Sequence, residues 1–143
     1  MNRRQRKKLA NRLVGAAIRE DAVALRALLR SGADPNAADR EGTTPLYQAS
    51  VQGAVECVRL LLAAGAAPDV ESGRGQEGTP LCAAAVWGHT AVVRELLASG
   101  ADPDLREDQG TGYAPLDWAL QNDHVSTTGL LLAAGATPAI VDD

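Results

Sequence analysis

The chain has 143 residues, of which 45% are hydrophobic, so it has enough apolar material for one domain of ordinary size. It contains no Phe, and its Leu, Ala and Val do not alternate with polar residues, which excludes a β-sandwich. The net charge of −4 argues against a nucleic-acid-binding domain, the apolar runs are too short to span a bilayer, and two Cys are too few for a disulfide framework.

Basic residues are concentrated at the amino terminus, where the first twelve positions hold six of the fourteen in the chain. The run lacks interleaved aromatic residues and leads directly into a helical pattern at Leu9. Residues 1–8 are therefore predicted to be a basic tail or an extension of the first helix. An alternative function for this run is an electrostatic tether to nucleic acid or to anionic lipid. Its members are Arg3, Arg4, Arg6, Lys7, Lys8 and Arg12.

Residue usage also predicts a location. No apolar segment with a cleavage site follows the basic run, so we expect no secretory signal. Cys57 and Cys82 lie among Val, Leu and Ala, where Cys is typically a small buried hydrophobe. We predict a soluble cytoplasmic protein, and its twelve Arg against two Lys are typical of GC-rich bacterial genomes.

From Leu9 onward the sequence repeats itself four times, with steps of 33, 35 and 35 residues. Gly-Ala pairs at 32–33, 65–66, 100–101 and 135–136 keep these steps, each with a Pro two places later. Such a period predicts stacked units that bury their apolar faces only against one another, as a single domain over 9–143. The units are predicted at about 9–39, 40–74, 75–109 and 110–143. Three further columns keep the steps: Leu13, Leu46, Leu81 and Leu116; Ala16, Ala49, Ala84 and Ala119; and Leu29, Leu62, Leu97 and Leu132.

Each unit is predicted to contain two short helices and a turn, most clearly in the second. Thr44 is suited to cap a helix that begins with Pro45, where a missing N–H costs nothing. Gly53 interrupts the pattern, and apolar residues over 55–62 form the stripe of a second helix. Gly65 then ends that helix, because glycine readily adopts positive φ.

These units resemble the ankyrin repeat. Thr44-Pro45-Leu46, Thr79-Pro80-Leu81 and Ala114-Pro115-Leu116 are similar to its Thr-Pro-Leu-His signature. Gly88-His89, followed by the pairs Val92-Val93 and Leu96-Leu97, resembles the middle of that repeat. The resemblance covers nearly all of 9–143. It implies an all-α solenoid of stacked helix-turn-helix units with β-hairpin-like loops that project at right angles. It also implies binding of another protein through the concave face.

The sequence departs from the ankyrin pattern in three places. The first unit has Asn11-Arg12-Leu13 in place of Thr-Pro-Leu, as expected of a terminal unit. The fourth has Thr127-Thr128 in place of paired aliphatics, which predicts an outer polar cap. Tyr47, Cys82 and Asp117 occupy the position of the signature His, so the usual side-chain hydrogen bonds at the base of the loops are in doubt.

The loops that enter the third and fourth units are each two residues longer than the loop that enters the second. The extra length lies in 72–77 and 107–112, and both segments are Gly-rich, so we expect them to be mobile.

By the ankyrin resemblance, the loop tips and the end of each first helix contact the partner. Trp87 ends one such helix, and Trp dominates many interfaces; packing over neighbouring helices is the alternative. Trp118 is predicted to be core. The predicted partner-binding residues are Arg40, Glu41, Thr43, Val51, Gln52, Arg74, Gln76, Glu77, Val86, Trp87, Asp108, Gln109, Thr111, Tyr113, Gln121 and Asn122.

Charge indicates the class of partner. Residues 13–143 hold eight basic and eighteen acidic residues, a net charge of −10, with many of the acidic ones in the loops. Such loops would attract a partner with a basic surface and repel nucleic acid. Simple solubility is an alternative reason for this excess of acid.

The residues that could support chemistry have simpler explanations. His89 and His124 lie 35 residues apart at one repeat position, where each starts a second helix and can bond backbone of its neighbour. No nucleophile is positioned beside a base, and no acidic cluster has metal-ligand spacing. We therefore predict no enzyme activity, no metal and no cofactor. We expect a monomer in the absence of the partner, with a self-associating scaffold as an alternative.

Overall fold

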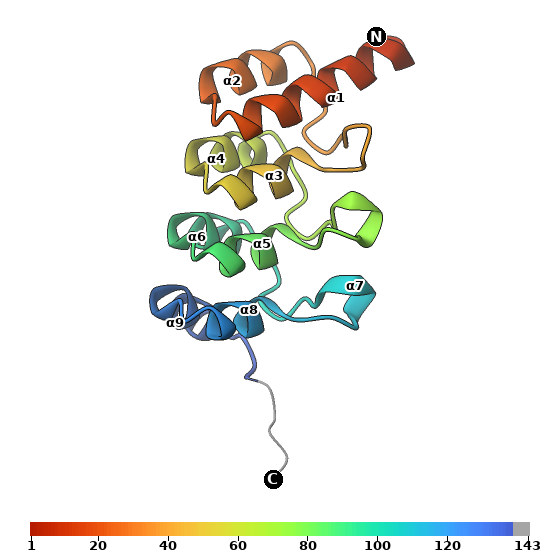
Figure 1. Cartoon of the computed structure of the whole chain (residues 1–143). Helices are drawn as coiled ribbons and strands as arrows, with labels where there is room; N and C mark the ends of the chain where they lie inside the picture. The colour runs from red at the N-terminus through yellow and green to blue at the C-terminus, as the bar shows by residue number, and fades with distance from the viewer. Residues whose placement is uncertain (139–143) are drawn as a thin grey trace.

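The computed structural model describes residues 1–138 of the chain, and over this range it is a helical solenoid (Figure 1). The helices form four pairs stacked in chain order, as the sequence predicted. Their bounds are α1 (Arg3–Ile18), α2 (Ala22–Arg30), α3 (Pro45–Gln52), α4 (Val55–Ala63), α5 (Pro80–Trp87), α6 (Thr90–Ala98), α8 (Pro115–Gln121) and α9 (Val125–Ala133). Two short turns lie in the connecting loops, η1 (Gly73–Gly75) and α7 (Glu107–Gly110).

The helix pairs form two rows. The first row consists of α1, α3, α5 and α8, each in contact with the next, and the second row consists of α2, α4, α6 and α9. Three loops project from the side of the first row: hairpin 1 (residues 34–43), hairpin 2 (67–78) and hairpin 3 (102–113) (Figure 1). Among the described residues β-type pairing is limited to one isolated bridge, between Ser72 and Gly78. The predicted fold class is confirmed.

The starts of the first-row helices follow from their sequences. Thr44 and Thr79 each accept a hydrogen bond from the third residue of the following helix, at 3.2 Å in both cases. Pro45 and Pro80 then occupy the first helical position. Ala114 has no side-chain oxygen, and there the Asp117 carboxylate accepts the Ala114 N–H instead, at 2.9 Å.

The two His residues join consecutive units. The Nε2 atom of His89 lies 3.0 Å from the carbonyl oxygen of Val51, and the Nε2 atom of His124 lies 2.9 Å from that of Val86. Each ring packs on the Gly that ends the preceding first-row helix, so closely that a Cβ at Gly53 would lie 2.6 Å from the His89 ring. The prediction that these His residues bond neighbouring backbone is confirmed.

The core runs through the stack between the two rows. The Leu13 and Ala16 columns are buried in all four units. The column that begins with Leu29 is only partly buried, and its last member, Leu132, is 45% exposed. From the second unit on, the residue just before each member of this column is more deeply buried, because it points between the rows. Leu61, Leu96 and Leu131 have no exposed surface.

Thr127 corrects one prediction. This residue was expected on an outer polar cap, but its side chain is fully buried. Its Oγ1 lies 3.3 Å from the Oγ1 of Thr90, so each hydroxyl has a polar partner across the interface between the third and fourth units. The prediction was wrong for Thr127 because that position faces back into the stack.

The basic segment at the amino terminus is helical. Helix α1 begins at Arg3, capped by Asn2, whose side chain accepts from Gln5 N at 2.9 Å while Gln5 Oε1 accepts from Asn2 N at 3.0 Å. At 16 residues it is longer than the other first-row helices, and its extra turns precede the position where those helices start. No helix over residues 1–138 combines the length and hydrophobicity that crossing a membrane requires.

Candidate partner-binding groove

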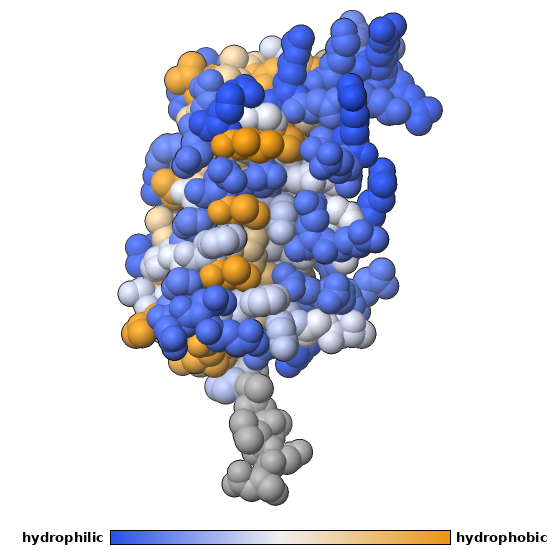
Figure 2. Space-filling model, in the orientation of Figure 1, coloured by the Kyte–Doolittle hydropathy of each residue, from blue (hydrophilic) through white to orange (hydrophobic). Residues whose placement is uncertain are grey.

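A hollow of about 470 Å³ lies between the first-row helices and hairpins 2 and 3. We call it the Trp87 groove. It brings together six predicted residues, namely Val51, Gln76, Glu77, Val86, Trp87 and Asp108. It also contains five that sequence reasoning did not assign to the site, namely Tyr47, Gly78, Ala83, Glu107 and Trp118. In Figure 2, apolar patches follow one another down the middle of this face, with hydrophilic atoms on both sides.

Trp87 is the last residue of α5 and 61% of its surface is exposed. Gly88 follows in the left-handed conformation with φ of 69°, which ends the helix beside the indole. Ile18, Val51 and Val86 occupy one repeat position in the first three units, and Ile18 is 50% exposed. An indole this exposed contributes little to the core, while it adds a large apolar surface to the groove.

The predicted residues at the other helix ends are partly engaged within the chain. Gln52 Nε2 donates to the Ile18 carbonyl at 3.3 Å, and Asn122 Nδ2 donates to the Trp118 carbonyl at 2.8 Å. Gln121 and Tyr113 line a different hollow, of about 330 Å³, beside Leu120. These two residues therefore lie outside the lining of the Trp87 groove.

Hairpin 1 contains a predicted contact that the structure does not support. Thr43 is only 4% exposed, and its hydroxyl donates to the two carboxylate oxygens of Glu77 at 2.9 and 3.1 Å. Thr43 therefore holds Glu77 in position and is too buried to meet a partner. Glu41 is exposed, and its N–H is taken by Asp39 at 2.9 Å. Arg40 lies with Arg74 at a second, basic hollow beside α1.

The hairpins, expected to be mobile, are tied to one another by hydrogen bonds. Gly73 N donates to the Gly42 carbonyl at 2.8 Å, which joins hairpin 2 to hairpin 1. Gln109 N donates to Glu71 Oε1 at 2.9 Å, which joins hairpin 3 to hairpin 2. The Thr111 hydroxyl donates within its own loop, to the Asp108 carbonyl at 2.7 Å. The loop wall of the groove is thus a connected layer.

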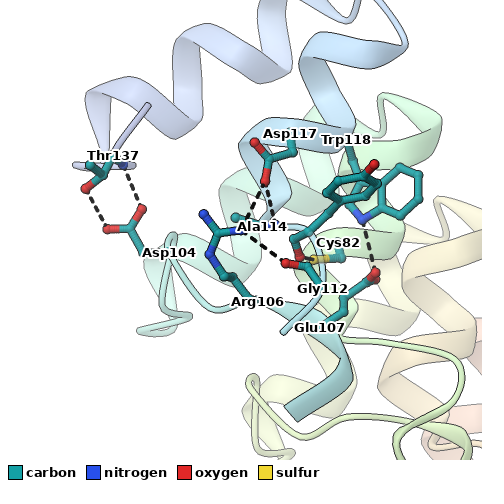
Figure 3. A network of polar contacts seen from close by, with 10 residues as sticks. Cys82, Asp104, Arg106, Glu107, Gly112, Ala114, Asp117, Trp118 and Thr137 are labelled. Carbon is teal, nitrogen blue, oxygen red and sulfur yellow. Dashed lines mark hydrogen bonds and ion pairs between the residues drawn. The ribbon is translucent and has the colours of Figure 1, made fainter. Parts of the chain in front are cut away.

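A polar network fixes the base of hairpin 3 (Figure 3). Trp118 Nε1 donates to Glu107 Oε2 at 3.1 Å, and Tyr113 stacks edge-on against the indole with ring centroids 5.0 Å apart. Trp118, predicted to be core, is therefore only partly buried and polar on one side. Arg106 donates to the Gly112 carbonyl at 3.1 Å and lies 3.7 Å from the Asp117 carboxylate. Burial raises the pKa of the Glu107 carboxyl.

The residues that replace the signature His restore contacts at the loop bases. The Tyr47 hydroxyl donates to the Glu77 carbonyl at 3.0 Å, and Cys82 Sγ donates to the Tyr113 carbonyl at 3.7 Å. Burial raises the pKa of the Cys82 thiol far above its usual range, so the group stays protonated and is a poor nucleophile.

The chain is similar to known proteins over its repeats. A family model described as ankyrin repeats (3 copies) matches residues 13–107 and, in an overlapping match, residues 67–142. Potassium channel AKT1 of Arabidopsis thaliana is 53% identical over 47 residues, which cover 33% of this chain and 6% of the channel. Ankyrin repeat and SOCS box protein 16 is 46% identical over 57 residues in Mus musculus and 42% identical over 53 residues in Homo sapiens. These two matches cover 40% and 37% of this chain but only 13% and 12% of the relatives.

Proposed function

Because the chain belongs to the ankyrin-repeat family, whose repeats generally serve as protein–protein interaction modules, we propose that the Trp87 groove and the hairpin tips hold one protein partner. The chain would act as an adaptor, scaffold or inhibitor rather than as an enzyme. We further propose that it works in the cytoplasm, where two free thiols such as Cys57 and Cys82 are ordinary.

The proposal depends on the exposure of Trp87 within a hollow. Trp is enriched among the residues that dominate binding energy, above all when a partner completes the removal of the ring from water. Here the indole shares the groove with Val51 and Val86 on the helix side. Glu77 and Asp108 line the loop side of the same groove. A partner segment with an apolar residue flanked by basic ones would match this arrangement.

Binding explains the side chains in the groove better than catalysis does. The thiol of Cys82, next to Ala83 in the chain, is buried, and burial raises its pKa so that it stays protonated, while both His rings contact backbone carbonyls. Over the described residues, no group of three or more His, Cys, Asp or Glu is arranged to hold a metal ion.

Trp87→Ala tests the proposal. The protein captured from host extract by the full chain is identified and purified, and its affinity is measured by calorimetry for the unchanged chain and the variant. We expect Trp87→Ala to weaken binding about tenfold or more, because truncation removes the largest apolar contact in the groove. The melting temperature should move by no more than about 2 °C, since the ring is mostly exposed.

Val125→Ala is the matched control, because Val125 is an exposed apolar residue of the second row, at 82% exposure. It should leave affinity unchanged. Equal affinity of Trp87→Ala and the unchanged chain would overturn the proposed site. A large fall in melting temperature for Trp87→Ala would show instead that the indole supports the fold.

A further inference from the structure

We infer that a second subsite of this surface binds a compact anionic group on the partner, either a phosphorylated side chain or paired carboxylates of a peptide. The inference rests on the proposed protein-binding function and adds a second point of contact to it. The subsite is a hollow of about 590 Å³ between α1, hairpin 1 and the tip of hairpin 2, which we call the basic hollow.

The extended part of α1 supplies one wall of the basic hollow. Arg4, Lys7, Lys8 and Asn11 lie at helical spacing, so they share one face of the helix, and all four line the hollow. The first-row helices of the other units start later in the repeat. The cations of this wall lie on the extension of α1, which begins eight residues before Asn11. Hydrophilic atoms dominate the upper right of Figure 2, where Figure 1 places the start of α1.

The opposite wall carries two arginines from separate hairpins. Arg74 Nη2 donates to the Arg40 carbonyl at 3.4 Å, which holds the two residues together. The stem of Arg74 lies over Gly42, where an added Cβ would be 2.9 Å from Arg74 Cγ, so only Gly leaves room for it. Arg74 also has a φ of 58°, rare for a residue other than Gly, Asn or Asp. The hollow is thus assembled from three segments of the chain.

The positive charge in this hollow is only partly neutralised from within the chain. Among residues 1–138, ion pairs involve Arg59 and Arg106, and none involves the five cations that line the basic hollow. Asp39 is the one acidic residue of the lining. Its Oδ1 already accepts from Glu41 N at 2.9 Å and from Thr43 N at 3.0 Å, which fixes the hairpin turn. With five cations against this one carboxylate, the hollow keeps an excess of positive charge, which favours an anion.

One of these cations, Arg4, lies in the first turn of α1, where a positive charge costs helix stability, which argues against a purely structural role for it. The first turn of α1 has no acidic residue, although the positive end of the helix dipole favours acid there. Arg3 and Arg4 occupy this turn instead. Neutral Asn2 and Gln5 already cap the helix, so the cations contribute nothing to its start.

A compact anion fits this surface better than a long polyanion. The basic hollow is bounded, and along the hairpins it is followed by Glu77, Glu107 and Asp108 of the Trp87 groove. A nucleic acid or a bilayer surface extended across both would meet this acidic wall, and residues 13–143 carry a net charge of −10. A peptide can place one anionic group in the basic hollow and a basic or apolar segment beside Trp87.

The test uses the ¹⁵N-labelled full chain and short Gly/Ser peptides as probes in an NMR titration. One peptide carries a phosphoserine, one carries a pair of Glu, and one carries neither. We expect the phosphoserine or the Glu peptide to shift amides of residues 4–11, 38–40 and 74, and the neutral peptide to shift none. Whichever anionic peptide binds more tightly identifies the source of the charge.

Arg40→Gln combined with Arg74→Gln should weaken binding of the anionic peptide about tenfold, since two charge-assisted contacts are lost. The matched control is Arg26→Gln combined with Arg94→Gln, which removes the same charge from exposed positions of α2 and α6. The control should change affinity less than about twofold. Equal losses in both pairs would overturn the inference, because they would reveal only general charge attraction. A melting curve of each double variant verifies that the fold is retained.

Three further probes separate other sources of anion. Inorganic phosphate that binds as tightly as the phosphopeptide would overturn the peptide assignment. If an oligothymidine strand or phosphatidylserine vesicles bind more tightly than the anionic peptides, the inference is overturned and the basic residues act as an electrostatic tether. Absence of binding by every anionic peptide would also overturn it. None of these results depends on Trp87, so failure of the basic hollow and failure of the Trp87 groove can be told apart.

Discussion

Hairpins 2 and 3 have the same backbone at their tips but are anchored by different side chains. Three consecutive residues have positive φ in each, over 73–75 and 108–110, and the paired values for Arg74 and Gln109 are 58° and 57°. At the base, one repeat position holds Ser72 in hairpin 2 and Glu107 in hairpin 3.

This difference, together with Trp118, changes where each loop is attached. The short Ser72 hydroxyl donates to Glu77 Oε1 in its own hairpin at 2.9 Å and accepts from the N–H of Thr44, just before α3, at 2.9 Å. The longer Glu107 side chain reaches the indole of Trp118 in α8. The comparison teaches that the repeat specifies the path of the backbone, while residues outside the repeat pattern decide how rigidly each wall of the groove is held.

The largest expected effect comes from pressing the two hairpins apart. Gly78 of hairpin 2 has a φ of 109°, and an added Cβ would overlap the Glu107 carboxylate of hairpin 3. Gly78→Ala should therefore lower the free energy of unfolding by about 2–3 kcal/mol, from strained backbone and from displacement of Glu107. Chemical denaturation measures this loss.

Gly110→Ala separates the two causes. Gly110 has a φ of 94°, but nothing lies within 4 Å of an added Cβ, so the variant carries the backbone strain alone. We expect a cost of about 1 kcal/mol. If the two variants lose equal stability, the contact between the hairpins does not constrain Gly78.

The same distinction, between residues of the repeat pattern and residues outside it, decides which features could be predicted from the sequence. Columns such as that of Leu13 recur at fixed steps, so their burial could be inferred without coordinates. The inward turn of Glu107 could not, because it depends on Trp118, which has no counterpart in the other units. Arg74 and Gln109 gave no sign of positive φ, since Gly or Asn would be the usual indication.

The site was predicted in the same uneven way. Trp87 was proposed from the sequence because it ends a first helix and Trp is enriched at interfaces, and the structure leaves its indole 61% exposed. The burial of Thr43 could not be predicted, because its hydroxyl meets Glu77, which is 34 residues away in the chain. The basic residues of α1 were noticed, but their meeting with Arg40 and Arg74 required the fold.

A smaller effect is expected where hairpin 2 is attached to hairpin 1. Thr43→Val keeps the shape of the buried side chain and removes the hydroxyl that donates to Glu77. We expect a loss of about 1 kcal/mol in the free energy of unfolding, typical of one buried hydrogen bond. Thr111→Val, at an exposed position in hairpin 3, should cost less than about 0.5 kcal/mol. Equal losses in the two variants would show that the Thr43 hydroxyl does not help to hold Glu77 in position.

The smallest effect depends on pH and belongs to hairpin 3. Burial raises the pKa of Glu107, so protonation is easier in the folded than in the unfolded chain. The stability that this group contributes is therefore present below its unfolded pKa and is lost as pH rises through the higher folded value. Glu107→Gln keeps an acceptor for Trp118 without the charge and should remove that loss.

We expect Glu107→Gln to be more stable than the unchanged chain by less than about 1 kcal/mol at pH 7, because solvent screens a half-buried group. The advantage should shrink steadily as pH falls toward 4, where Glu107 itself becomes neutral. Urea denaturation of both proteins across this range gives the difference directly. An advantage that grows on acidification would mean that the Trp118 hydrogen bond favours the carboxylate more than burial disfavours it. The negative charge of Glu107 would then stabilise hairpin 3.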